Sequence, residues 1–459
     1  MRVWSAPVQI LFVTAAIAPY HPPSETGDVS RALCKALRGL DHRVTVVAPL
    51  YSGTDPTSHS LARKLSTLDV SVGGKAHPCA VYEGRTTGGV DLTFVDSPVF
   101  GDAPAAQDDP AGRTAAVVLC KAAALVAERM QNRPDVVHAL GYQGALAAPL
   151  CKATLEGIGT VISVSSSSPT GEGDADEIAR WELPEPLAKL AGAGNILSTG
   201  IATCDRVVVD SSVALDAVAD DKEQGPKTVA IPNAVDSSVW NAMTDPAIEA
   251  RFDPANTAGK DRCKAALQLA LELPLRPETP LLGVVGEGSD VAIARVAEKL
   301  LRNDVQVAVG IAGETPCDAL SALCEQHDDK LKVVNVSEEE ALHQLIAGSD
   351  LLMLSPEAGH TGTLHLCAQR YGAPPIVPDA SLAAESVVDC DAQLETGSGF
   401  VYADEDASLG SALGRALSAH ARTEDFQTLR KRVMNIDASW ERAARRYEQV
   451  YRSAAPTPA

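Results

Sequence analysis

The chain of 459 residues is poor in aromatic side chains, which make up 4% of it, although 45% of its residues are hydrophobic. Aliphatic side chains, above all alanine and valine, are therefore expected to fill its cores. Cations are also scarce, because 39 Lys and Arg stand against 60 Asp and Glu, which gives a net charge of −21. This excess argues against nucleic acid or an anionic membrane as a partner. Any site for a phosphorylated ligand would need its own local cations.

None of the ten cysteines forms a Cys-x-x-Cys pair, so no metal site is expected. Their dispersed, mostly apolar settings favour free thiols in a reducing compartment, and we predict a cytoplasmic protein without a cofactor. No apolar run reaches about 18 residues without a charge, so no membrane span is expected. The segment Ile10–Ala18 has features of a signal peptide, but we interpret it as the first strand because a helix follows it in register.

Short apolar segments alternate with helical ones along the chain, a pattern typical of parallel sheets with helices on both faces. Residues 232–280 are more polar and irregular, with a charged helix over Lys260–Glu272, before a second alternating series starts at Leu281. The predicted strands are Ile10–Val13, Val44–Ala48, Leu92–Val95, Val136–Ala139, Val161–Val164, Arg206–Val209 and Thr228–Ile231, then Leu281–Val285, Val305–Ile311, Leu331–Val334, Leu351–Leu354, Ile376–Val377 and Phe400–Tyr402.

This pattern predicts an α/β fold with two doubly wound Rossmann-like domains facing an interdomain cleft. We expect an N-terminal domain over 1–255, a linker over 256–280 and a C-terminal domain over 281–437. An amphipathic helix over 438–452 is expected to cross back to the N-terminal domain, and 453–459 is expected to be a disordered tail.

The N-terminal strand Ile10–Val13 leads into a predicted loop that contains Pro22, Pro23 and Gly27, and a helix is expected over Val29–Arg38. The loop lies at the carboxyl end of a strand, where open parallel sheets bind ligands. The N-terminal βαβ unit is therefore the first place to look for a site.

Seven segments resemble, in the same order, motifs of the bacterial glycogen synthases and plant starch synthases. They are Pro134–Ala139 with Ala145–Ala147, Asp205–Val207, Pro232–Asp236 with Val239–Asn241 and Thr244–Pro246, Gly259-Lys260 with Cys263–Gln268, Ala347–Asp350, Arg370–Gly372, and Ser439–Arg442 with Ala443-Ala444. On these segments the chain is identified as a member of that family over about residues 8–452. The resemblance implies the two-domain GT-B glycosyltransferase architecture.

The resemblance also implies retaining glucosyl transfer from ADP-glucose, in which cations hold the leaving diphosphate. Five or six loops that serve the donor in the family are altered here, and three of them concern the phosphates. The first loop has Pro22 for a lysine and places Glu25 where a diphosphate would need bare backbone; Glu287 replaces an arginine; and Asp379–Leu382 replaces a glycine-containing loop. Each lost cation–phosphate hydrogen bond costs ~1.5–3 kcal/mol, whereas millimolar binding is worth only ~4 kcal/mol.

No residue is assigned as catalytic, and four candidates remain. Ser165 takes the place of a histidine that contacts the donor in the family. It is either a sugar contact or part of a flexible serine loop. His138 is retained at a strand end, where it has either a structural role or a sugar contact. Glu357 lies two residues before Gly359, which replaces the family's glutamate, and it is a site carboxylate or a solvated loop residue. His360 follows in the same loop. The candidates for nucleotide-sugar contact are Gly27, Asp28, Thr361 and Gly362.

We predict a protein of glucan metabolism that is catalytically inactive or impaired, a pseudoenzyme that acts by binding or regulation. Its expected partners are an α-glucan or a nucleotide sugar, and an active synthase or another protein of glycogen metabolism. The alternative is an active retaining glycosyltransferase that uses ADP-glucose or another nucleotide sugar to extend an α-1,4-glucan or to modify another acceptor. The first hypothesis predicts a neutral or acidic surface where a diphosphate would lie.

Overall fold

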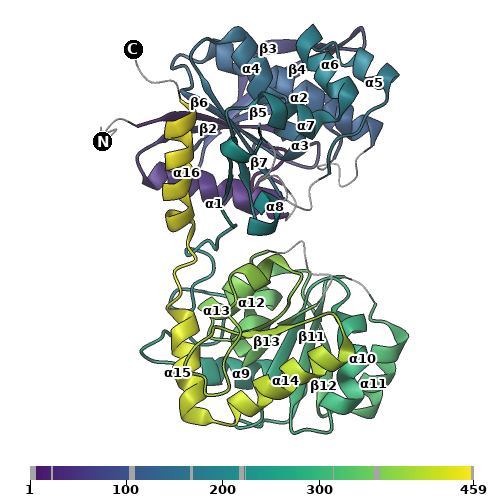
Figure 1. Cartoon of the computed structure of the whole chain (residues 1–459), viewed down its shortest axis with the longest axis vertical. Coiled ribbons are helices and arrows are strands. Elements are labelled where there is room, and N and C mark those ends of the chain that lie inside the picture. The colour runs from purple at the N-terminus through teal and green to yellow at the C-terminus, as the bar shows by residue number, and fades with distance from the viewer. Residues whose placement is uncertain are drawn as a thin grey trace. The chain divides into compact units, whose positions relative to one another are not determined.

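The computed structural model describes residues 7–21, 24–102, 109–165, 169–216, 222, 224–313, 315–355 and 362–455. It divides into two compact units, one of Met1–Asn233 with Trp440–Ala459 and the other of Ala234–Ser439 (Figure 1). The N-terminal segment of the first unit thus ends at Asn233, which is 22 residues before the domain boundary expected at 255. Residues 256–280 were expected to be a linker, but they contain α9 (Ala258–Ala270), which packs on α12 (Glu339–Gly348) within the second unit.

The first unit is built on a nine-stranded sheet in the order β3-β4-β5-β2-β1-β6-β7-β8-β9. The seven strands predicted in this half are present, and all of them pair in parallel. β3 and β4 were not predicted, and they form an antiparallel hairpin at one edge. The strands are β1 (Gln9–Val13), β2 (Arg43–Leu50), β3 (Ala62–Val72), β4 (Lys75–Arg85), β5 (Asp91–Asp96), β6 (Val136–Leu140), β7 (Gly159–Val164), β8 (Arg206–Val209) and β9 (Thr228–Ala230).

Helices cover both faces of this sheet because successive residues of each strand point to opposite sides. Leu11 and Val13 of β1 face a core shared with α2 (Pro110–Arg129), whereas Phe12 contacts His138 on the opposite face. The remaining helices of this unit are α1 (Glu25–Gly39), α3 (Gly141–Gly144), α4 (Ala147–Thr154), α5 (Ala175–Arg180), α6 (Glu185–Ala193), α7 (Ile196–Thr203), α8 (Ser212–Asp216) and α16 (Trp440–Ala454), with 3-10 turns η1 (Pro98–Phe100) and η2 (Gly225–Lys227).

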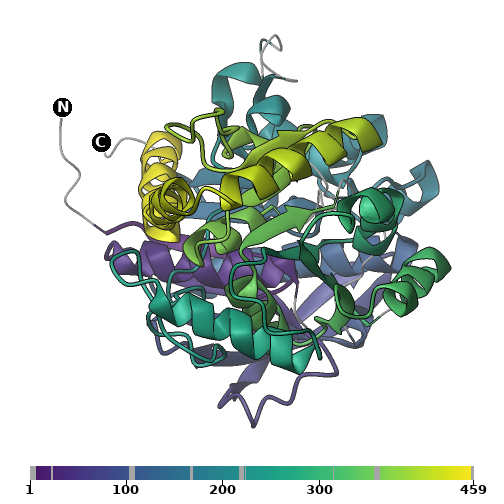
Figure 2. The same ribbon diagram turned by 90° about the horizontal axis from the view of Figure 1, so that it is seen from below.

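The C-terminal helix α16 belongs to the first unit and lies beside α1, as both views show (Figures 1 and 2). Its apolar side buries Trp440, Tyr447 and Tyr451. The helix extends to Ala454, so the start of the expected disordered tail is helical. Residues 456–459 lie outside the described residues.

The helix α2 is long and apolar enough to cross a membrane by length and composition, the one such helix among the described residues. Of its most apolar stretch, 61% is buried within the first unit. Core helices of globular domains share these properties, so the helix is weak evidence for a membrane span. All ten cysteines are described, and each is a free thiol.

The second unit has a six-stranded parallel sheet in the order β12-β11-β10-β13-β14-β15, and its strands follow the prediction. They are β10 (Leu281–Val285), β11 (Gln306–Ile311), β12 (Leu331–Asn335), β13 (Leu351–Leu354), β14 (Pro375–Pro378) and β15 (Phe400–Tyr402). Its other helices are α10 (Ser289–Leu300), α11 (Asp318–Gln326), α13 (Leu364–Arg370), α14 (Asp406–His420) and α15 (Thr423–Met434), with the 3-10 turn η4 (Leu382–Glu385). Both units therefore have the doubly wound α/β fold that the sequence predicted.

A buried ion network joins the elements of the second unit. Asp350, which is 5% exposed, receives Lys264 of α9 at 2.7 Å and Arg430 of α15 at 2.9 Å. Asp350 also accepts the backbone N–H of Leu281 at 3.0 Å, at the start of β10. The motif segments Cys263–Gln268 and Ala347–Asp350 thus meet in one packing cluster, which gives them a structural role.

Candidate functional site

A polar cavity of about 220 Å³, here called the first cavity, lies in the first unit at the carboxyl ends of β6, β7 and β8. Beside it the strand order reverses, because β2 lies on one side of β1 and β6 lies on the other. Open α/β sheets bind ligands at such a reversal. The polar side chains that line it are Glu25, Thr26, Gln143, Ser163, Ser165, Asp210, Asn233 and Tyr447.

Glu25 lines this cavity because α1 begins earlier than predicted. The helix starts at Glu25 rather than Val29, and Ser24 is its N-cap, since the Ser24 hydroxyl accepts the N–H of Gly27 at 3.1 Å. The part of the expected loop from Glu25 onward is therefore the first turn of the helix, whereas Pro22 and Pro23 lie outside the described residues. The carboxyl of Glu25 occupies the helix end that would otherwise attract an anionic ligand.

Glu25 has two polar neighbours from distant parts of the chain. The amide of Asn233 donates a hydrogen bond to Glu25 Oε1 at 3.2 Å, and Asp210, the first residue after β8, lines the same cavity. Burial and the negative charge of Asp210 raise the pKa of Glu25 to about 7, although the hydrogen bond from Asn233 opposes this rise. Both the neutral and the charged form of Glu25 are therefore populated at neutral pH.

No Lys, Arg or His is among the described residues that line the first cavity. Two carboxyl groups face it instead, together with the hydroxyls of Ser163, Ser165 and Tyr447. Such a wall offers hydrogen bonds to hydroxyl groups, and it repels phosphate whenever the carboxyls are charged.

We expect the Glu25→Gln variant to be more stable than the wild type at pH 8, by on the order of 1–3 kcal/mol, and to gain little at pH 4. The pKa of Glu25 is raised from 4.5 to about 7 in the folded chain. The folded state therefore keeps a proton that the unfolded state releases between these values, and stability falls as the pH rises through that window. Urea unfolding at several pH values measures the difference.

The matched control is Asp28→Asn, which removes an exposed carboxylate from the same helical turn. We expect it to reduce the Glu25-dependent slope only slightly, because the charge of Asp28 is the smallest of the contributions that raise the pKa of Glu25. A constant difference between wild type and Glu25→Gln from pH 4 to pH 8 would contradict the assignment of the raised pKa.

Ser165 lines the first cavity directly after β7, as its candidate role requires. His138 lies behind the wall and is fully buried. Its Nδ1 is 2.8 Å from the hydroxyl of Tyr451, and its Nε2 is 2.7 Å from Ser163 Oγ. Both ring nitrogens are thus occupied, which favours the structural alternative, and burial lowers the pKa of His138 to about 3.

Gly27 and Asp28 are not among the residues that line the cavity. Gly27 is buried in the first turn of α1, where a Cβ would lie 3.3 Å from the backbone nitrogen of Ala18. Asp28 faces outward and pairs with Arg31 at 3.2 Å. Glu25, Thr26 and Val29 line the cavity instead, because they lie on the inner side of the same helix.

Three candidates of the second unit, Glu357, His360 and Thr361, lie outside the described residues. Gly362, the next candidate, directly precedes Thr363, which is the N-cap of α13. In the loop after β10, Gly286 and Gly288 have φ of 112° and 67°, and Glu287 between them is exposed. Ser355 donates a hydrogen bond to the carbonyl of Glu287, which ties this loop to the end of β13.

Sequence reasoning missed six polar residues of the first cavity: Thr26, Gln143, Ser163, Asp210, Asn233 and Tyr447. A signal existed for Asp210, because it directly follows a predicted strand at the ligand-binding edge of the sheet. Asn233 was recorded only as part of a motif. Tyr447 was recorded only as an apolar residue of the last helix, yet its hydroxyl lies 3.4 Å from Ser163 Oγ.

The two doubly wound units have the GT-B fold. The structure is similar to the catalytic domain of Starch Synthase IV from Arabidopsis thaliana bound to ADP and acarbose, with a TM-score of 0.84, 21% identity, and coverage of 98% of this chain and 100% of that one. It is also similar to a sucrose-phosphate synthase from Thermosynechococcus elongatus, with a TM-score of 0.61, 13% identity, and coverage of 97% and 98%.

The family model of the starch synthase catalytic domain matches residues 9–225. The glycogen synthase of Anaeromyxobacter dehalogenans strain 2CP-C is 29% identical over 487 residues, with 98% of this chain and 100% of that protein covered. Glycogen synthase 2 of Geobacter sulfurreducens is 26% identical, with 98% and 99% covered. The N-terminal half of the chain is thus similar to the starch synthase catalytic domain, and nearly the whole chain is similar to glycogen synthases, as the motif order indicated.

Proposed function

We propose that this chain is a glycogen synthase-like protein of glucan metabolism that binds an uncharged saccharide in the first cavity and does not use a nucleotide-sugar donor. The observation that carries the proposal is the position of Glu25 at the N-terminus of α1, half-buried and hydrogen-bonded to Asn233. In the resembling family, the corresponding loop serves the nucleotide sugar. Here a carboxyl occupies that place.

Electrostatics support a neutral ligand over a diphosphate. Two unit charges of the same sign 4 Å apart repel by about 4 kcal/mol at the effective dielectric constant of ~20 that is typical near a protein surface. Asp210 and the charged form of Glu25 both oppose a phosphate, and no cation of the described lining offsets them. A sugar hydroxyl carries no charge, and it can exchange hydrogen bonds with Ser163, Asn233 and the neutral form of Glu25.

Isothermal titration calorimetry tests this proposal. We expect maltotetraose to bind, and we expect no heat of binding with ADP-glucose or UDP-glucose at concentrations up to millimolar. Asn233→Ala should weaken maltotetraose binding about fivefold, since it removes one hydrogen bond worth ~1 kcal/mol. The control Asp28→Asn should leave the affinity unchanged. Micromolar binding of either nucleotide sugar would overturn the proposal.

One observation favours the alternative of an active transferase. A carboxyl group with a pKa of about 7 in a ligand-sized cavity is suited to general acid or base catalysis near neutral pH. This alternative requires glucosyl transfer or donor hydrolysis with some member of a broad nucleotide-sugar panel. It also requires that Glu25→Gln abolish the turnover. The absence of turnover across the panel would exclude it.

A further inference from the structure

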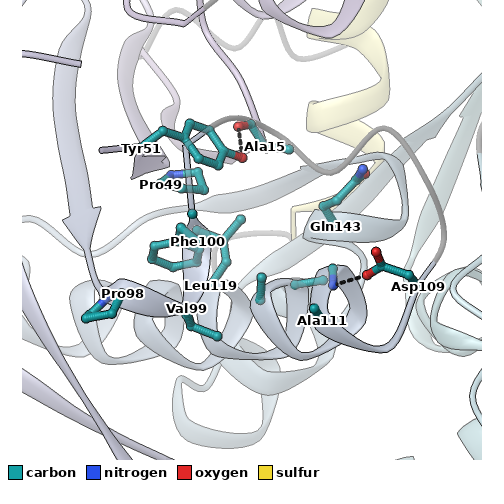
Figure 3. A pocket seen from close by; sticks show the side chains of 14 residues that line it. Ala15, Pro49, Tyr51, Pro98, Val99, Phe100, Asp109, Ala111, Leu119 and Gln143 are labelled. Atoms are coloured by element: carbon teal, nitrogen blue, oxygen red, sulfur yellow. Dashed lines mark hydrogen bonds between the residues drawn. The ribbon is translucent and has the colours of Figure 1, made fainter. Parts of the chain in front are cut away.

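A second cavity of about 230 Å³ lies in the first unit between the ends of β1, β2 and β5 and one side of α2. Figure 3 shows its lining, in which the rings of Tyr51 and Phe100 lie on one side and Leu119 and Ala111 of α2 lie below them. It lies at the same edge of the sheet as the first cavity. Ligands bind along this edge in open α/β folds.

Most polar groups of the second cavity already have partners. The hydroxyl of Tyr51 donates to the carbonyl of Ala15 at 2.9 Å. The carboxylate of Asp109 caps α2 by accepting the N–H of Gly112 at 2.6 Å. No Lys or Arg is among its described lining residues. The cavity therefore suits an uncharged, largely apolar group.

Gln143 of α3 lines both cavities. Its position is fixed by close packing, because a Cβ on the next residue, Gly144, would lie 2.7 Å from the carbonyl oxygen of Val13. The α3 backbone thus lies tightly against the end of β1, and this fixes the backbone position from which Gln143 reaches both cavities. An amide can donate to one side and accept from the other.

We propose that the second cavity is a subsite for an apolar group attached to the saccharide in the first cavity. The preferred ligand is then a glycoside with a small, uncharged aromatic or aliphatic substituent, and Gln143 lies where the two parts join. This inference rests on the proposed function. The size is adequate, because an apolar cavity of about 150 Å³ is known to bind benzene, and burial of apolar surface supplies the affinity.

Calorimetric titration with phenyl α-glucoside and methyl α-glucoside tests the subsite. We expect the phenyl compound to bind at least tenfold more tightly to the wild type. Ala115→Phe, which places a ring in the second cavity from α2, should bring the two affinities within about twofold of each other. The control Thr114→Phe adds the same ring at a neighbouring position that does not line the cavity, and it should keep the tenfold ratio. Thermal unfolding of both variants verifies that they are folded.

The outcomes separate this inference from the proposed function. Equal affinities of the two glucosides for the wild type, or a tenfold ratio that survives in Ala115→Phe, would overturn the subsite and leave saccharide binding intact. If no saccharide binds, the proposed function fails, and phenol alone then decides the subsite. Phenol binding that Ala115→Phe abolishes would support the apolar subsite, whereas no phenol binding would overturn it.

Discussion

Replacing Asp350 with alanine is expected to lower the stability of the second unit by about 3–5 kcal/mol, because the change leaves two buried cations without their shared carboxylate. Lys264 and Arg430 are 4% and 2% exposed, so water cannot take over the role of Asp350. Burial of Asp350 opposes its ionisation, but the hydrogen bond from His420 and the charges of Lys264 and Arg430 hold its pKa well below the usual range. Hydrogen exchange of the α9 and α15 amides, read by mass spectrometry, measures the loss in this unit.

The control is Asp404→Ala, which removes an ion pair with Arg295 on the surface, where the Asp404 side chain is 58% exposed. We expect it to cost less than about 1 kcal/mol. Because the pKa of Asp350 is depressed, its contribution is present above the unfolded pKa and is lost as the pH falls through the lower folded value. Similar losses from Asp350→Ala and Asp404→Ala would refute the importance of the buried network.

Replacing His138 with alanine is expected to lower the stability of the first unit by about 3 kcal/mol at pH 7.5. The change opens a void beneath α16 and leaves the hydroxyls of Tyr451 and Ser163 without a shared partner. Hydrogen exchange of the α16 amides provides the measurement. Tyr451→Phe, which removes one hydroxyl and keeps the ring, should cost less, and the double variant should show coupling between the two sites.

The pH dependence of the stability distinguishes a buried, structural His138 from a solvent-exposed one. Burial lowers the pKa of His138 to about 3 in the folded chain, whereas an unfolded histidine titrates near 6.5. Between these two pH values the unfolded state binds a proton at His138 and the folded state does not. The stability of the wild type therefore falls as the pH drops below 6.5. The deficit of His138→Ala should shrink at pH 4.5. An equal deficit at both pH values would mean that the imidazole titrates normally.

The segments by which the sequence resembles its family are largely packing elements. Lys264 and Asp350 come from two of these segments and meet in the buried network. Gly372 comes from a third, and its carbonyl accepts Arg430 Nε at 3.1 Å. Such motifs identify a fold reliably, because a buried charge must keep its partners. Packing segments of this kind carry no information about the ligand, whereas Asn233 of the segment Pro232–Asp236 lines the first cavity.

Two local features were misread for physical reasons that the structure reveals. Gly27 indicated a loop, but the helix accepts it because Ser24 caps the first turn. The β3–β4 hairpin was missed because most of the first half of β3 is exposed and shows no alternation. The turn signal was nevertheless present in Gly73-Gly74, which both have positive φ, as tight hairpin turns require.

The sequence by itself determined the two α/β units, their parallel strands and the resemblance to glycogen and starch synthases, because periodicity and motif order act over short stretches of chain. Tertiary structure alone decided the character of the first cavity. Glu25 and Asn233 are 208 residues apart in the sequence and 3.2 Å apart in space. The pKa of a carboxyl group depends on burial and on the charges that surround it in three dimensions. Only the folded chain could therefore show that a carboxyl group with a pKa of about 7 lies at the N-terminus of α1.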